Sequence, residues 1–386
     1  MINNTWGIII VLAGLQTLVM SLAGHRRFAR YFTFLPSVFW IYFLPMLAST
    51  GGLIDPQHPV YGVITKNILP ASLFLLLLGV DIKAIIGLGP KALAMMLCGS
   101  AGIMLGTVIT FTLFKSIVGE PMWAGFGALS ASWIGGSANL VAVKEVLSTP
   151  DEVFLPMVIV DTIVPYFWMG ILVSAVGLRP LFDRFTGTDP NVLEKFRQNS
   201  VSGSSGPGRF SFGMAVMILA IAFAGGFAAI NISRYLPEIK DVISTYAWTV
   251  ILASLFGLAF SLTPARQLEK RGSNRIGYIL LYFVLASIGA KASLSNISAS
   301  FTLIAAGFLI VFIHATVLLV AARLLRAPMF LAAVASQANI GGVASAPIVA
   351  EVYQPGLASV GILLAVFGGI LGTYLGILTG HLCHLL

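Results

Sequence analysis

Long apolar segments alternate with short polar ones along the whole chain. An α-helix needs about 20 apolar residues to cross a bilayer, and twelve segments approach or exceed that length. We predict that each is a membrane-spanning helix: 5–23, 33–50, 64–80, 90–116, 122–148, 152–177, 211–232, 242–263, 277–293, 299–323, 328–353 and 357–380.

Residues 178–210 form the longest polar stretch and divide the twelve segments into two groups of six. The stretch ends in SVSGSSGPGR, a composition typical of a flexible connection. We therefore interpret it as a polar linker between residues 1–177 and 211–386, with no room for a soluble domain.

The composition supports a membrane protein. Of the 386 residues 58% are hydrophobic and 9% are charged, whereas a soluble protein averages about 25% charged residues. This excludes a soluble fold and predicts an all-α, multi-pass integral membrane protein. The net charge of +8 then reflects the positive-inside rule rather than nucleic-acid binding. Cys98 and Cys383 provide neither a disulfide framework nor a transition-metal site.

The loop charges give a conflicting orientation. Residues 178–210 hold five Lys and Arg, residues 264–276 hold four, and Arg323 and Arg326 fall on the same, cytoplasmic side. The basic loop 24–32 falls on the other side if every span is real. We therefore expect one crossing in the first half, or near the linker, to be miscounted.

An internal repeat relates the two halves. Residues 130–146 (SASWIGGSANLVAVKEV) align with residues 336–352 (SQANIGGVASAPIVAEV) at eight of seventeen positions, including a Gly-Gly pair. This similarity predicts two structural repeats, 1–177 and 211–386.

Each Gly-Gly pair lies at the middle of its span, 122–148 in one half and 328–353 in the other. Glycine-interrupted spans at matching places in two halves indicate the binding site of a transporter. Close packing of small residues is the alternative, but it does not explain the three amides, Asn139, Gln337 and Asn339, that surround the interruptions. We therefore predict two broken helices, with Pro347 as a further reason for the second to come apart.

The second half of each broken helix begins with unpaired backbone N–H groups, which favour an anion such as a carboxylate. These groups belong to residues 137–139 and 342–345. The candidate solute-binding residues are Trp133, Gly135, Gly136, Ser137, Asn139, Ser336, Gly341, Gly342 and Ser345.

The first half of each broken helix ends with unpaired carbonyl groups, and oxygen ligands suit Na⁺ better than a soft metal. Asp161 lies three or four residues from the centre of its span, and an acidic residue there typically faces an ion pathway. A structural, hydrogen-bonded Asp161 is the alternative. The candidate ion-binding residues are Ser130, Ser132, Asn139, Asp161, Thr162, Gln337 and Asn339.

For three further residue types the sequence allows more than one role. Glu145 and Glu351 match in the repeat but lie about ten residues from the midplane, so each is a candidate gate or an anchor of a helix end. His314 either relays protons or is a neutral, buried side chain bonded to a neighbouring helix. Trp133 either lines a solute pocket or packs in the interior.

The paired motifs GGSAN and NIGG resemble the crossed, broken helices of the bile acid:sodium symporter and cation:proton antiporter superfamily. Over nearly its full length, especially in LLLLGVDIK, SASWIGGSANLVAVKE and SQANIGGVASAP, the chain is similar to the YjcL-like family of uncharacterised membrane proteins. The resemblance implies inverted repeats arranged as a panel domain and a core domain. It also implies one sodium site with Asn139 and Asp161, and a second with Gln337 and Asn339.

Two features bear on this resemblance. The twelve-span list gives both halves the same orientation, whereas inverted repeats require opposite orientations, which again indicates a miscounted span. The chain also lacks the paired acidic or Asn-Asp motif of the antiporters at its interruption, which favours solute symport over Na⁺/H⁺ exchange.

We therefore expect a sodium-coupled symporter of a small organic solute, such as an amino acid, small peptide or organic acid, that works by alternating access. A Na⁺/H⁺ antiporter using Asp161 is the alternative. A non-transporting sensor or scaffold stays open, whereas a protease lacks the GxSG or GxGD motif it would need.

We expect no enzymatic activity and no cofactor besides Na⁺ as coupling ion. The expected partners are a solute, Na⁺ or H⁺, and the lipid bilayer, without nucleic acid; a homodimer is left open. The expected location is the bacterial inner membrane.

Overall fold

The computed structural model describes residues 1–25, 27–28, 32, 37–188, 211–239, 244–291 and 300–386. All the regular secondary structure in these ranges is helical, apart from an isolated bridge between Ile2 and Ile54. The predicted all-α class is therefore confirmed. Eight helices among the described residues are long and apolar enough to cross a bilayer, so the chain is a multi-pass integral membrane protein.

Each of the twelve predicted segments contains helix. Eight hold a single helix of spanning length, and two hold a pair of helices separated at the Gly-Gly motif. The remaining two are shorter, namely α3 (Ser37–Thr50) and α13 (Thr245–Ser261). A 97° bend follows α13, where the chain enters the 3₁₀ segment η2 (Pro264–Arg271).

The helices group into two compact units, each described here by itself. Unit 1 consists of residues 1–80, 148–162 and 207–300, and unit 2 consists of residues 81–147, 163–206 and 301–386. Each unit therefore draws helices from both halves of the sequence. The helix α9 (Asp151–Ser174) contributes its first half to unit 1 and its second half to unit 2.

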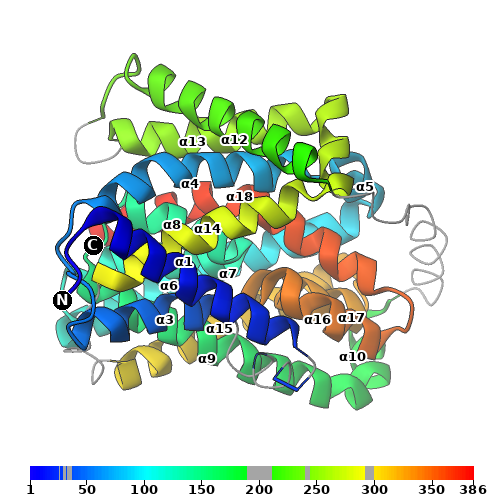
Figure 1. Ribbon diagram of the computed structural model, residues 1–386. Coiled ribbons are helices and arrows are strands. Elements are labelled where there is room, and N and C mark those ends of the chain that lie inside the picture. The colour runs from blue at the N-terminus through cyan, green and yellow to red at the C-terminus, as the bar shows by residue number, and fades with distance from the viewer. Residues whose placement is uncertain (26, 29–31, 33–36, 189–210, 240–243, 292–299) are drawn as a thin grey trace. The chain divides into compact units, whose positions relative to one another are not determined.

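Unit 1 is built around α4 (Val60–Leu78). Besides α3, α13 and η2 it contains α1 (Thr5–Gly24), α12 (Phe212–Ser233) and α14 (Ser273–Lys291). The helices α12, α13 and α14 all contact α4 (Figure 1). Glycine allows this close approach, because a Cβ atom on Gly257 would lie 2.5 Å from the carbonyl oxygen of Phe74.

Unit 2 contains both interrupted helices. Its elements are α5 (Ile82–Gly87), α6 (Pro90–Val118), α7 (Met122–Gly135), α8 (Ser137–Val146), η1 (Ala175–Leu178), α10 (Arg179–Thr186), α15 (Ser300–Leu325, from Phe301 on), α16 (Met329–Ile340), α17 (Gly342–Tyr353) and α18 (Ala358–His384).

The helix α18 packs along α7 through a row of glycines four residues apart. Since residues at this spacing share one helix face, the row lets the two backbones approach closely. Cβ atoms at these positions would collide with Ile134, Asn139, Ala131 and Leu147; the glycines are Gly368, Gly372, Gly376 and Gly380. The row holds α7, and with it the first interruption, in a fixed place within unit 2.

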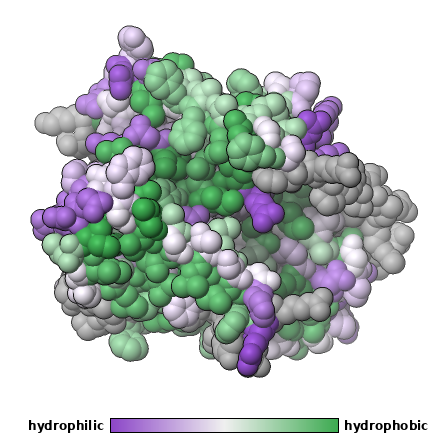
Figure 2. Space-filling model, viewed as in Figure 1, coloured by the Kyte–Doolittle hydropathy of each residue, from purple (hydrophilic) through white to green (hydrophobic). Residues whose placement is uncertain are grey.

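Apolar side chains dominate the face of the molecule shown in Figure 2. Large hydrophobic residues such as Trp6, Phe227 and Phe312 are more than 60% exposed. Exposure on this scale is costly in water but favourable in lipid, in agreement with a membrane environment.

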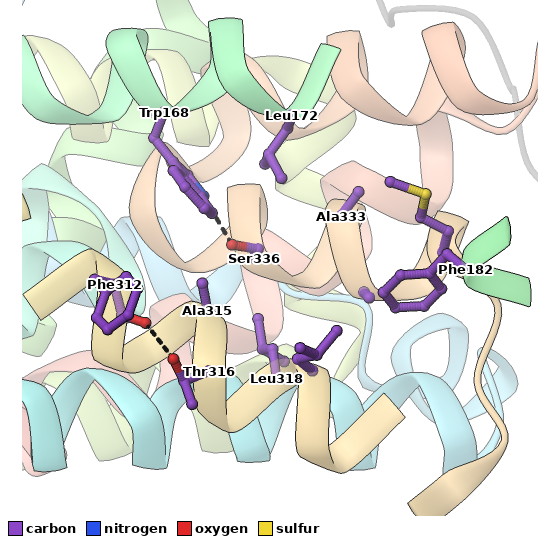
Figure 3. Close-up of a pocket in the computed structure, with 12 residues that line it drawn as sticks. Trp168, Leu172, Phe182, Phe312, Ala315, Thr316, Leu318, Ala333 and Ser336 are labelled. Carbon is purple, nitrogen blue, oxygen red and sulfur yellow. Dashed lines mark hydrogen bonds between the residues drawn. The ribbon is translucent and has the colours of Figure 1, made fainter. Parts of the chain in front are cut away.

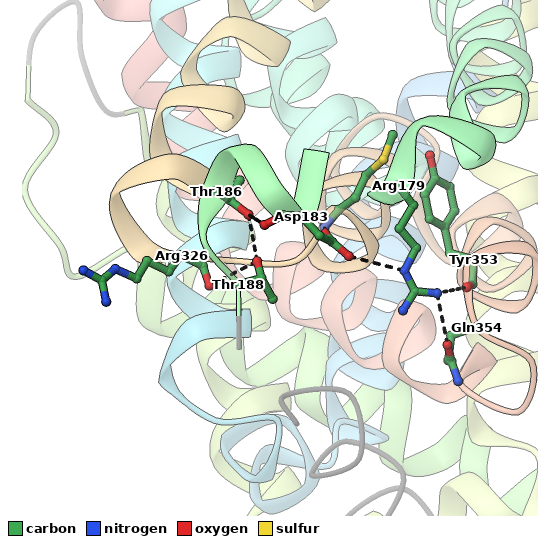
Figure 4. A network of polar contacts seen from close by, with 8 residues as sticks. Arg179, Asp183, Thr186, Thr188, Arg326, Tyr353 and Gln354 are labelled. Carbon is green, nitrogen blue, oxygen red and sulfur yellow. Dashed lines mark hydrogen bonds and ion pairs between the residues drawn. The ribbon is translucent and has the colours of Figure 1, made fainter. Parts of the chain in front are cut away.

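The predicted linker begins with the helix α10, while residues 189–210 lie outside the described residues. The side chain of Arg179 donates to the Asp183 carboxylate at 3.4 Å and to the Tyr353 carbonyl at 3.2 Å, and Asp183 accepts the Met329 N–H at 2.7 Å. These contacts attach α10 to the start of α16 and to the end of α17 (Figure 4).

Candidate functional site

The helix expected over 122–148 is two helices, α7 and α8, separated at Gly136. Gly136 has φ 91° and ψ 177°, a conformation open almost only to glycine. Gly135 is required for a different reason, because a Cβ atom there would collide with the Asn139 amide and lie 2.7 Å from the Gly368 carbonyl. The sequence therefore breaks the helix with one glycine and makes space with the other.

The second interruption follows the same rule. The helix α16 ends at Ile340, and α17 begins at Gly342, which has φ 61°. A Cβ atom on Gly341 would collide with Ser345 and Gln337. The expectation that Pro347 would also open this helix was wrong, since Pro347 lies inside α17.

The two interruptions meet. A Cβ atom on Gly342 would lie 4.0 Å from the Cα atom of Gly136, which is van der Waals contact. Residues 135–138 are partly exposed at this point. The first N–H groups of α8, those of Ser137 and Ala138, have no carbonyl partner within the helix, and they lie where the helices meet.

Asn139 fastens the first interruption to α18. Its amide nitrogen donates to the Gly135 carbonyl at 2.8 Å and to the Gly369 carbonyl at 3.3 Å. Its amide oxygen accepts the hydroxyl of Thr373. Both donors are therefore used, and the oxygen keeps one lone pair for a further contact.

Gln337 bridges the second interruption. Its amide nitrogen donates to the Ser345 hydroxyl at 2.7 Å, across the break, and to the Pro165 carbonyl of α9 at 3.3 Å. Because a proline carbonyl only accepts, this bond fixes which end of the amide is nitrogen. The opposite oxygen, Oε1, is buried and has no hydrogen-bond partner among the described residues.

Asn339 also has a buried amide oxygen without a hydrogen-bond partner among the described residues, and less space surrounds this oxygen. Its amide nitrogen donates to the Ser100 hydroxyl at 3.0 Å, and that hydroxyl donates in turn to the Met96 carbonyl. The amide oxygen is buried without a partner in the described part of the chain. It lies against Gly99, where a Cβ atom would collide with it.

Ser336 belongs to a buried chain of hydrogen bonds. Its hydroxyl lies 2.9 Å from Nε2 of His314 and accepts the indole N–H of Trp168 at 2.9 Å. Nδ1 of His314 lies 2.9 Å from the Gly99 carbonyl. Since a carbonyl can only accept, Nδ1 carries the proton, and a neutral His314 then accepts from Ser336 through Nε2.

Three other predicted residues of unit 2 are buried in its interior. The Ser130 hydroxyl donates to Thr379 at 3.3 Å, and Ser132 accepts the Gly136 N–H through its carbonyl. Trp133 is completely buried, and its indole N–H has no hydrogen-bond partner among the described residues.

Asp161 and Thr162 lie in the part of α9 that belongs to unit 1, whereas the other predicted site residues lie in unit 2. Asp161 is half-buried. Pro165 has no N–H group to donate to the carbonyl four residues before it. The Thr162 hydroxyl donates to the Val158 carbonyl at 2.7 Å.

The two candidate gates lie at helix ends. Glu351 accepts the Gly356 N–H through both carboxylate oxygens, at 3.1 and 3.0 Å, where α17 ends. Glu145 pairs with Lys144 at 2.9 Å near the end of α8. The Glu351 contact is that of a helix-end anchor, whereas Glu145 pairs with its neighbour on the same helix.

Sequence reasoning missed several residues of this region, namely Ser100, Lys144, Trp168 and Thr373. Lys144 is 4% exposed, and one signal was available, because Lys144 and Glu145 are the only charged residues in segment 122–148. The other three lie on other helices and carry no local motif.

The sequence pattern of the family described as "Protein of unknown function (DUF819)" matches residues 7–386. The uncharacterized membrane protein YjcL of Bacillus subtilis (strain 168) is 27% identical over 349 residues, which cover 87% of this chain and 87% of the relative. The resemblance to the YjcL-like family is thereby confirmed, and the chain belongs to the DUF819 family.

Proposed function

We propose that this member of the DUF819 family is a secondary active transporter that couples Na⁺ to a small organic solute at the two helix interruptions of unit 2. The observation that carries the proposal is the Gln337 amide oxygen, which is buried beside the second interruption and has no hydrogen-bond partner among the described residues.

A buried polar atom without a partner costs about 1–3 kcal/mol, so its presence at an interruption calls for a ligand. An amide oxygen is a hard ligand, suited to a cation such as Na⁺. Gln337 is held by Ser345 across the break and by Pro165 of α9, so a bound cation would act on both halves of the interrupted helix. Asn339 is the weaker candidate for a cation ligand because its amide oxygen lies against Gly99, which leaves less space for an ion.

The solute side of the proposal rests on the start of α8. Ser137 and Ala138 are partly exposed and directly follow Gly136, which lies in van der Waals reach of Gly342, and a helix start favours a carboxylate. An amino acid, small peptide or organic acid fits this chemistry. Binding of Na⁺ would order the interruptions and raise the affinity for the solute.

The test is thermal unfolding of the purified protein in NaCl and in KCl. A ligand at 100 times its Kd stabilises the folded state by about 2.7 kcal/mol, so Na⁺ should raise the Tm of the wild type. Gln337→Leu should abolish this response. Gln16→Leu is the matched control, because Gln16 is a buried amide in unit 1 that donates to the Ile279 carbonyl at 2.9 Å.

Proteoliposome uptake of candidate solutes would then test coupling. A rate of solute uptake that is the same with and without a sodium gradient would contradict sodium coupling. A pH-sensitive dye that responds to Na⁺ without any solute would instead favour Na⁺/H⁺ antiport through Asp161.

A further inference from the structure

A cavity of about 310 Å³ opens on the side of unit 2, among α9, α10, α15 and α16 (Figure 3). Its walls include Trp168, Leu172, Phe182, Leu318, Met329 and Ser336. The proposed Na⁺ site at Gln337 and the proposed solute site at the start of α8 lie outside its lining.

The polar atoms in the cavity wall are already paired. The Ser336 hydroxyl is bonded to His314 and Trp168, and the Thr316 hydroxyl donates to the Phe312 carbonyl at 2.9 Å. Every other lining side chain is apolar. A polar solute would lose its hydrogen bonds to water here without replacement, so the cavity suits a hydrocarbon ligand.

The cavity is accessible from the lipid-facing side of α15. Phe312 is 69% exposed and Leu319 is 45% exposed, and both line the cavity. The helix α15 is among those long and apolar enough to cross the bilayer. Its exposed apolar residues therefore face lipid, and acyl chains are the hydrocarbon nearest to the opening.

The distance along α15 from the cavity to the basic end of the helix matches one leaflet. Phe312 and Arg323 are eleven residues apart on α15, which corresponds to about 16 Å along the helix axis. One leaflet contributes about 15 Å of hydrocarbon. An acyl chain lying between these two residues would therefore place its headgroup near Arg323.

The rim at that end is positively charged. Arg323 lies one helical turn beyond Leu319, and its guanidinium is 5.8 Å from the ring of Phe185 on α10. Arg184 and Arg326 are also exposed at this end. The nearby carboxylate of Asp183 is already engaged by Arg179 and the Met329 N–H (Figure 4).

We propose that this cavity binds an acyl chain of an anionic phospholipid whose phosphate contacts Arg323. Charge complementarity selects the headgroup, because basic residues between spanning helices attract anionic lipids. Basic residues at the end of a spanning helix favour the cytoplasmic side, so the lipid of this proposal belongs to the cytoplasmic leaflet.

The test is native mass spectrometry of the full-length protein with phosphatidylglycerol or phosphatidylcholine added at equal concentration. The wild type should retain phosphatidylglycerol preferentially. Ala315→Phe fills the cavity and should abolish retention. Ala305→Phe is the matched control, since Ala305 is exposed on the same helix and does not line the cavity.

Arg323→Gln tests the headgroup contact. One basic residue near the surface contributes about fivefold in affinity for anionic lipid, so the preference for phosphatidylglycerol should fall about fivefold. Arg275→Gln, an exposed arginine of unit 1, should leave it unchanged. Unchanged retention in Ala315→Phe, or an unchanged preference in Arg323→Gln, would overturn the proposal. All four variants should keep the wild-type melting temperature in lipid-free detergent within a few degrees. If Ala315→Phe fails this, Ala332→Phe replaces it, and if Arg323→Gln fails this, Arg184→Gln replaces it.

Discussion

At the scale of single residues, the two glycines of each interruption are required for different reasons. Gly136 and Gly342 have positive φ, whereas Gly135 and Gly341 leave space for the amides of Asn139 and Gln337. A Cβ atom on Gly136 would meet nothing within 4 Å. The need for glycine at that position is therefore purely a matter of backbone conformation.

We predict that Gly136→Ala lowers the free energy of unfolding by about 1–3 kcal/mol, because alanine at φ 91° and ψ 177° is strained. Gly14→Ala is the control. Gly14 lies inside α1 with open space around it, and alanine there should be neutral or stabilising by up to about 1 kcal/mol. Chemical unfolding in detergent measures both. Equal effects of the two substitutions would contradict the strained conformation.

We predict that substitutions of His314 and Ser336 are coupled in their effects on the free energy of unfolding, because the two side chains are hydrogen-bonded. Single substitutions His314→Phe and Ser336→Ala each leave a buried partner unsatisfied. We expect the double variant to be more stable than the sum of the two losses predicts, by about 0.5–3 kcal/mol.

The control for this cycle pairs His314→Phe with Ser130→Ala. Ser130 bonds Thr379 and shares no hydrogen-bond partner with His314, so those two losses should add. Additive losses for His314 and Ser336 would mean that their bond contributes nothing to stability.

At the scale of helices, the glycine row of α18 determines how closely α7 approaches. A Cβ atom on Gly376 would lie 2.9 Å from the Cα atom of Ala131, so the packing leaves no room for a side chain. The first interruption is thereby positioned by a helix more than 200 residues away in the sequence.

We predict that Gly376→Leu lowers the free energy of unfolding by about 1–3 kcal/mol through overpacking. Gly170→Leu on α9 is a matched control, because a Cβ atom on Gly170 meets nothing within 4 Å. Unfolding of the two variants in detergent should separate them clearly. A Gly376→Leu variant as stable as Gly170→Leu would show that the α7–α18 contact is adjustable.

Hydropathy predicted the helices well, because lipid requires long apolar runs whatever the packing. It missed α10 within the supposed linker. That helix has eight residues and alternates arginines with aromatic residues, so its average polarity is that of a loop. Its fixed position depends on bonds to Met329 and Tyr353, which no local pattern reveals.

At the scale of the whole molecule, the grouping of helices could not be read from the sequence. The two compact units alternate along the chain, with boundaries after residues 80, 147, 162, 206 and 300, and no local sequence pattern marks these boundaries. The two repeats, 1–177 and 211–386, stay a prediction. The candidate site could be predicted only in part. The Gly-Gly motif located both interruptions, but the partners of Asn139 and Ser336 lie on helices whose proximity depends on packing.

The basic loops predict how the chain is oriented. In a variant lacking Cys98 and Cys383, a cysteine at Glu238 should react with a membrane-impermeant maleimide added outside the cell. A cysteine at Arg271 should react only after permeabilisation, because α13 lies between these exposed positions and its following loop is basic. Labelling of both from one side would show that α13 does not cross the bilayer.

The hydrogen-bond chain through His314 has one further consequence, for proton conduction. One end of the chain is the Trp168 indole, which can only donate, and the other is the Gly99 carbonyl, which can only accept. A proton wire must take up a proton at one end and reset by turning every bond around, and neither terminal group permits this. The Nδ1 proton of His314 is therefore held in place by this chain, and the chain itself does not conduct protons.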